Sequence, residues 1–186
     1  MRWLDGNSPH FERMNREAGH AASLYFHGMH RYRIQGIPES IATAARATMR
    51  SPQYGHPAHV EVATGYGPCR LCLQTFTVGT DERLLFTYQP FTDSDALPAP
   101  GPVFIHHEPC GRYDDAALPD ALRPLPLVLE GYGAGGALMV QRRVGSASFE
   151  PVLNEVLGCP GTHYVHLRNA EAGCFIARID LHAPSD

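Results

Sequence analysis

Glycine and proline occur throughout this chain, and they set the strongest limit on what it can fold into. The 186 residues include 18 glycines and 16 prolines, spread along the chain rather than gathered in one linker. Proline interrupts helices and glycine marks tight turns, so a chain punctuated in this way is divided into many short elements. We therefore expect a sheet with many turns rather than a bundle of long helices.

Composition limits the class of protein further. Hydrophobic residues make up 44% and charged residues 18% of the chain, which is enough apolar surface for one domain with its own core. The formal net charge of −4 argues against a protein that neutralises nucleic acid phosphates. No apolar run approaches the ~18 residues of a membrane span, and residues 1–7 lack the apolar segment of a signal peptide. We expect a soluble cytoplasmic protein with no nucleic acid or membrane partner; the sequence leaves the oligomeric state undetermined.

The first 30 residues differ in character from the rest. Ser8 suits a helix cap and Pro9 a first helical position, ahead of apolar residues at helical spacing. Met29 offers a second possible start of the chain. We therefore predict an N-terminal helical arm or appendage over residues 1–30 and a single α+β domain over residues 31–186.

Within the predicted domain, two helices and several strands stand out. The helices are expected at 38–47, which is rich in alanine, and after Ser148 at 149–157. Strands are expected at 59–64, 71–78, 83–89, 103–107, 127–130, 137–144, 162–168 and 174–181. The run at 71–78 is predicted to form a hairpin with 83–89. Together these predict a mostly antiparallel sheet of about six to eight strands, with two or three helices on one face.

Cysteine and histidine supply the candidate chemistry. Cys69 and Cys72 form a C-x-x-C pair, which fits a zinc half-site, a redox dithiol or chance. The pair is expected to open a strand rather than a helix, so a thioredoxin-like dithiol fits less well. His106 and Cys110 could bind one ion from the end of a strand and its following loop. His163 and His166 lie three apart on a strand and should point to opposite faces.

Four ordered blocks of sequence carry a resemblance to a known family. The blocks are residues 68–73 (PCRLCL), 83–91 (RLLFTYQPF), 101–113 (GPVFIHHEPCGRY) and 164–175 (YVHLRNAEAGCF). Together they resemble the bacterial domain-of-unknown-function 1203 family, over about residues 31–182. The resemblance implies a single bacterial domain and shows which positions form its motifs, but it implies no activity.

The blocks separate the cysteines into two groups. Four cysteines lie inside the blocks, whereas Cys159 lies outside them. We therefore predict a zinc site whose ligands are Cys69, Cys72, Cys110 and Cys174. His106 or His166 could be a substitute ligand or a hydrogen-bonding partner of one. Four protein ligands would make a structural site, and three with one water would leave a position for catalysis.

Two alternatives without a metal stay open. In the first, Cys69 beside Arg70 is a reactive thiol that acts with His106 or His166 and is oriented by Asn169. In that pocket the guanidinium groups of Arg70, Arg112 and Arg168 would bind an anionic small molecule. In the second alternative the same residues are structural, the arginines being surface charges or ion-pair partners, and the domain has a structural or interaction role.

Overall fold

The fold comes from a computed structural model, which describes residues 31–65, 67–91, 100–145 and 148–182. These residues belong to one compact unit, Arg31–Asp186. The N-terminal helical arm predicted for residues 1–30 lies outside the described residues. Neither α-helix of the described part has the length and hydropathy needed to cross a membrane.

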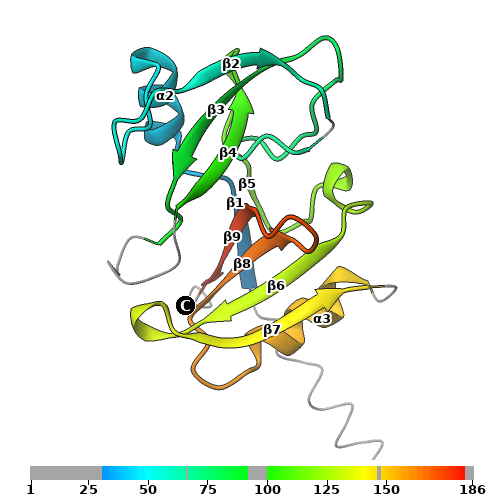
Figure 1. Cartoon of the computed structure of the whole chain (residues 1–186). Helices are drawn as coiled ribbons and strands as arrows, with labels where there is room; N and C mark the ends of the chain where they lie inside the picture. The colour runs from blue at the N-terminus through cyan, green and yellow to red at the C-terminus, as the bar shows by residue number, and fades with distance from the viewer. Residues whose placement is uncertain (1–30, 66, 92–99, 146–147, 183–186) are drawn as a thin grey trace, which may run out of the picture. The chain divides into compact units, whose positions relative to one another are not determined.

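The larger sheet has six strands in the order β5-β1-β9-β8-β6-β7, and all neighbouring strands are antiparallel (Figure 1). Its strands are β1 (Arg31–Gln35), β5 (Asp114–Asp115), β6 (Leu127–Tyr132), β7 (Leu138–Val144), β8 (Tyr164–Asn169) and β9 (Phe175–His182). One face is apolar because side chains alternate along a strand: Leu129, Leu167 and Ile179 are fully buried there. Helix α3 (Phe149–Leu157) packs on that face and completes the larger core with Leu153.

The opposite face of this sheet carries polar side chains. His166 in the middle of β8 stands directly opposite Glu130 on β6 and Arg178 on β9. Directly opposed residues in an antiparallel pair share a face, so these three side chains lie together. Arg168 lies two residues along β8, on the same face as His166. Strand pairing therefore brings together charged groups from three strands that are distant in the sequence.

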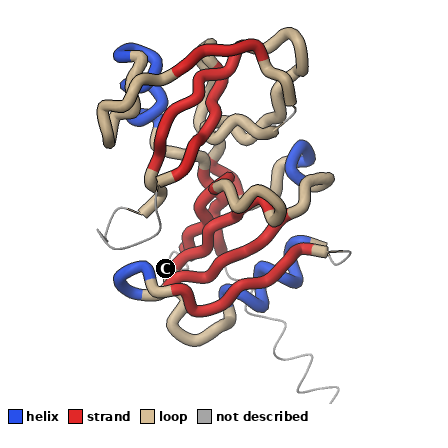
Figure 2. Tube along the Cα trace, in the orientation of Figure 1, coloured by secondary structure: helices blue, strands red, loops and turns tan. Residues whose placement is uncertain are grey.

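The smaller sheet has three antiparallel strands in the order β2-β3-β4 (Figures 1 and 2). These are β2 (His59–Val62), β3 (Glu82–Tyr88) and β4 (Gly101–His106). Helix α2 (Glu39–Thr48) shares a second core with this sheet, in which Ala42 and Ala45 join Leu84 and Phe86. Two short 3-10 helices, Asp120–Leu122 and Ala134–Gly136, complete the regular elements of the described residues.

The expected α+β class with mostly antiparallel sheet is confirmed, with corrections to its details. The described residues form nine strands rather than six to eight, because β1 and the two-residue β5 were not counted. The predicted strand at 71–78 is wrong: this segment forms turns, and β3 pairs with β2 and β4 instead. The two helices do not share one face, since α2 packs with the smaller sheet and α3 with the larger. Each sheet therefore has its own helix and its own core.

Candidate metal centre

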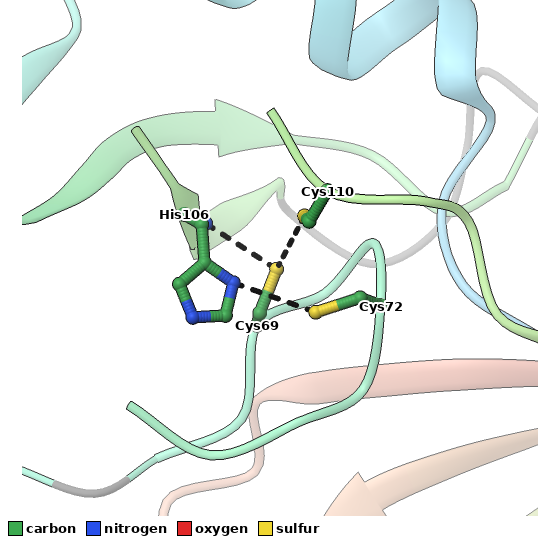
Figure 3. A group of neighbouring side chains, drawn as sticks. All are labelled: Cys69, Cys72, His106 and Cys110. Carbon is green, nitrogen blue, oxygen red and sulfur yellow. Dashed lines mark hydrogen bonds between the residues drawn. The ribbon is translucent and has the colours of Figure 1, made fainter. Parts of the chain in front are cut away.

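The C-x-x-C segment forms a tight loop. The backbone N–H of Cys69 donates to the carbonyl of Gln74 at 2.8 Å, and that of Leu73 donates to the carbonyl of Cys69 at 2.9 Å. Leu73 has a φ of 59°, in the left-handed region that a leucine seldom adopts. The chain therefore reverses direction here, and the thiols of Cys69 and Cys72 point toward the same small volume (Figure 3).

Two further side chains reach that volume from a second segment. His106 is the last residue of β4, and Cys110 lies in the loop that follows it. The N–H of Arg70 donates to the carbonyl of Phe104 at 2.8 Å, which fastens the C-x-x-C loop to the end of β4. Cys69, Cys72, His106 and Cys110 consequently converge, although 41 positions separate the first from the last (Figure 3).

The four side chains are close enough to share one ion. One ligand atom from each residue lies within 4.8 Å of every other. The two sulfurs of Cys69 and Cys110 are 3.8 Å apart, and Sγ of Cys72 is 3.4 Å from Nδ1 of His106. The backbone N–H of His106 also donates to Sγ of Cys69 at 3.3 Å. Cys69 is fully buried and the other three side chains are partly buried.

One cationic and one anionic side chain lie next to this cluster. From α2, Nη2 of Arg46 donates to Sγ of Cys110 at 3.4 Å and to the carbonyl of His106 at 2.9 Å. Oδ2 of Asp81 lies 3.6 Å from Nε2 of His106, and the N–H of Thr77 holds that carboxylate at 2.7 Å. Sequence reasoning missed Arg46 and Asp81 because neither lies in a motif block. Their position follows only from the packing of α2 and the β2–β3 connection.

The protonation of the cluster reflects this crowding. Hydrogen bonds with Cys110 and Cys72 lower the pKa of the Cys69 thiol, and hydrogen bonds with Cys110 and Cys69 raise the pKa of the Cys72 thiol. Contacts with Cys110 and then Cys69 raise the pKa of His106 to about 10. Three thiolates this close repel one another unless a cation lies among them. The cluster is therefore suited to hold positive charge.

Two of the predicted site residues are placed elsewhere. Cys174, predicted as the fourth sulfur ligand, is not in the group, and its Sγ lies 3.7 Å from the carbonyl of Ala172. His106 lies in the place where Cys174 was expected. Asn169 was predicted to orient the reactive thiol of Cys69 in the alternative without a metal; instead its Oδ1 accepts the backbone N–H groups of Glu171 and Ala172 at 2.9 and 2.7 Å. Both residues therefore shape the turn between β8 and β9.

His166 is also separate from the cysteines and lies within a group of aromatic rings. The ring centroids of Phe91, Tyr132, Tyr164 and Phe175 lie 4.7 to 5.2 Å from that of His166. The imidazole is fully buried, and neither ring nitrogen has a hydrogen-bond partner among the described residues. Burial, with the positive charges of Arg168 and Arg178, lowers its pKa to about 2. This residue is a neutral core histidine.

The three predicted anion-binding arginines do not line one pocket. Arg70 is buried and donates from Nε to the carbonyl of Phe175 and from Nη1 to that of Pro68. Nε of Arg168 lies 2.6 Å from the carboxylate of Glu130. Arg112 donates from Nε to the carbonyl of Gly36 at 3.0 Å and lines a cavity that neither of the others reaches. Of the three arginines, only Arg112 therefore stays a candidate for binding an anion.

Comparison with known proteins identifies the family. Residues 66–180 match the model of the family described as "Protein of unknown function (DUF1203)". The match spans more than half of the chain and includes all four residues of the cluster, so the chain belongs to this family. It begins later than the expected resemblance over 31–182, but it covers the four motif blocks. No curated protein and no solved structure matches the chain.

Proposed function

We propose that this member of the DUF1203 family holds one zinc ion in a structural site. The ligands are the sulfurs of Cys69, Cys72 and Cys110 together with Nδ1 of His106. The observation that carries the proposal is the convergence of these four ligand atoms within 4.8 Å of one another. Three cysteines and one histidine are a common ligand set of tetrahedral structural zinc.

The distances suit the size of the ion. With Zn–S bonds of about 2.3 Å and tetrahedral angles, two sulfurs lie about 3.8 Å apart. The sulfurs of Cys69 and Cys110 are separated by 3.8 Å. With a Zn–N bond of about 2.0 Å, a sulfur and a nitrogen lie about 3.5 Å apart. Sγ of Cys72 and Nδ1 of His106 are separated by 3.4 Å. These two pairs of ligand atoms therefore already have the separation that a tetrahedral zinc ion requires.

The surrounding charges also favour a zinc site. Three thiolates and one Zn²⁺ have a net charge of −1, and the guanidinium of Arg46 next to Cys110 supplies the opposite charge. Asp81 stands behind His106 at the nitrogen that does not face the sulfurs. A carboxylate in that place fixes the ring orientation and strengthens the other nitrogen as a ligand. These outer groups support metal binding independently of the ligand distances.

Four protein ligands point to stability rather than to catalysis. They fill every position of a tetrahedral ion and leave none for a reacting water. The segments that carry them are also hydrogen-bonded to their surroundings: the N–H of Ile37, in the β1–α2 connection, donates to the carbonyl of Arg70 at 2.8 Å, and the N–H of Tyr113, after Cys110, donates to the carbonyl of Leu71 at 2.9 Å. A bound ion would therefore hold both loops in the shape that these bonds require.

The alternative of a reactive thiol has less support. Its nucleophile, Cys69, is fully buried, which keeps a substrate from its sulfur. Of the residues proposed to act with it, Asn169 caps a turn and His166 is enclosed by aromatic rings. His106 alone remains beside the thiol, in the position of a metal ligand.

Elemental analysis of protein purified without added metal tests the proposal. We expect about one zinc per chain, with the thiols of Cys69, Cys72 and Cys110 reacting with a thiol reagent only after a chelator is added. Cys174→Ser is the matched control because this thiol lies outside the cluster, and it should keep the full zinc content. The site would be excluded by substoichiometric metal together with cluster thiols, those of Cys69, Cys72 and Cys110, that react in the same way with and without a chelator.

A further inference from the structure

A cavity of about 220 Å³ lies where the β1–α2 connection, the end of β3 and the start of β9 meet. Its lining is partly apolar, with Ile37, Pro38 and Phe175, and partly polar or cationic, with Tyr88, Arg112 and Arg178. Most ligand pockets have volumes of about 300 Å³ or more. This cavity is smaller and therefore suits a small organic molecule. The lining therefore offers hydrogen-bond donors beside an apolar surface.

Arg112 is held at this cavity by a hydrogen bond and forms no ion pair with a described residue. Its Nε donates to the carbonyl of Gly36 at 3.0 Å, which sets the direction of the guanidinium. Among the described residues, no carboxylate lies within ion-pair distance of Arg112, and neither of its Nη groups has an acceptor. In contrast, Arg33 and Arg168 are both paired with acids. Arg112 thus keeps two donor groups for a ligand.

Two further groups face the same cavity. Arg178 is held by Asp180, whose carboxylate oxygens lie 2.9 and 3.0 Å from its Nε, and its guanidinium stacks 3.9 Å above the ring of Tyr164. Asp180 also lines the cavity, so two guanidiniums and one carboxylate leave one net positive charge. Tyr88 lines the cavity as well, with its ring centroid 5.9 Å from that of Phe175, and burial raises the pKa of its hydroxyl to about 12. The phenol is therefore a neutral donor at neutral pH.

We propose that this cavity binds a small organic monocarboxylate, held by the Nη groups of Arg112 with Tyr88 as a further donor and Arg178 as a second cation. A guanidinium binds a carboxylate through two parallel hydrogen bonds, and one net positive charge matches a monoanion. The apolar body of the ligand would lie against Ile37, Pro38 and Phe175. This site differs from the pocket predicted from the sequence, because Arg178 and Tyr88 take the places expected for Arg70 and Arg168.

Binding is tested with acetate, butyrate and benzoate added to the full-length protein, followed by two-dimensional NMR or calorimetry. We expect at least one of these carboxylates to bind and its neutral amide to bind far more weakly. Arg112→Gln should weaken binding at least about tenfold, because a hydrogen bond to a charged group is lost. Tyr88→Phe should weaken it about threefold or more. Arg142→Gln, on the exposed β7, is the matched control and should bind as the native chain does.

Because Arg112 lies two residues after Cys110, the zinc content and thermal melting of each variant are measured as well. Loss of binding in an Arg112→Gln protein that keeps its metal content and melting temperature supports the carboxylate site. Should that variant unfold, Tyr88→Phe carries the test, because it removes only a hydroxyl group. The proposal is overturned if none of the carboxylates binds, if inorganic phosphate binds better than all of them, or if both variants bind as tightly as the native chain.

Discussion

Two histidines, one on a strand of each sheet, have opposite surroundings. His106, at the end of β4, has Cys72 at Nδ1 and Asp81 near Nε2, and its pKa is raised to about 10. His166, in the middle of β8, has no hydrogen-bond partner among the described residues at either nitrogen, and its pKa is lowered to about 2. The same side chain has polar partners beside both nitrogens in one place and none in the other. The difference lies in the partners that each position allows.

Position along the strand explains the contrast. At the end of β4 the chain leaves the sheet, so the C-x-x-C loop and the β2–β3 connection can approach the imidazole from two sides. In the middle of β8 the neighbouring strands occupy both edges, and aromatic side chains cover the open face. The charged groups on the same face are bonded elsewhere, Glu130 to Tyr132 and Arg168, and Arg178 to Asp180, so none of them bonds to the imidazole. Clusters of ligands therefore form more readily at strand ends than in the centre of a sheet.

The largest effect is expected from breaking the His106 cluster. Cys110→Ser should remove the zinc and lower the free energy of unfolding by several kcal/mol, because structural zinc ions contribute about 10–16 kcal/mol of apparent binding free energy in small domains at pH 7. Chemical denaturation, together with metal analysis, measures both losses. Cys159→Ser, outside the cluster, should change neither. Equal stability of the Cys110 variant and the native chain would show that the cluster does not support the fold.

A smaller effect is expected from replacing His166, which should remove a pH dependence of the unfolding free energy of about 2 kcal/mol between pH 7 and pH 5. The unfolded histidine has a pKa of about 6.5 and takes up a proton below it, whereas the folded one, with a pKa of about 2, does not. The neutral imidazole therefore contributes its full stability above pH 6.5, and this is lost as the pH falls toward 2. Between pH 7 and pH 5 the loss is about 2 kcal/mol.

In the His166→Phe variant this dependence should be absent. Denaturation at pH 7 and pH 5 is compared for both proteins, so that acid release of the metal, which affects both, cancels. The stability difference between variant and native chain should shift by about 2 kcal/mol in favour of the variant at pH 5. A difference that does not change with pH would mean that His166 is not held neutral.

The smallest effect is expected from the outer partner of His106. Asp81→Asn keeps an oxygen to accept the N–H of Thr77 but removes the negative charge near Nε2. Zinc affinity, measured by competition with a chelator, should fall about tenfold, as is usual when such a partner is lost. Glu108→Gln, a nearby acid outside the cluster, is the control. The ring of His106 also packs on that of Phe76, with centroids 4.7 Å apart. Unchanged zinc affinity in the Asp81 variant would mean that this packing, and not Asp81, orients the imidazole.

Much of the fold could be predicted from the sequence. The alternating residues of β3 and β6–β9 and the apolar spacing of α3 all have local signals that the structure confirms. The exception is the segment 71–78, whose alternation resembles a strand but forms turns. There the hydrogen bonds with Gly67, Cys69 and Tyr113 override the local pattern.

The candidate site was only partly predictable. Three of the four residues in the cluster were predicted as ligands, and His106 as a substitute for one of them. The choice between His106 and Cys174 could not be made from the sequence, because both lie in motif blocks and nothing local tells which of them approaches Cys69. Arg46, Asp81 and Arg178 have no motif at all.

The sequence by itself determined the α+β class, the two helices, most of the strands and the residue types that could bind a metal. These depend on interactions within a few positions along the chain: alternation, capping and turn formation. Only the tertiary structure decided which side chains meet, including the separation of His106 from His166 and the placement of Arg112 and Arg178 at one cavity. Such choices depend on strand register and loop packing between residues far apart in the chain, for which a single sequence holds no local signal.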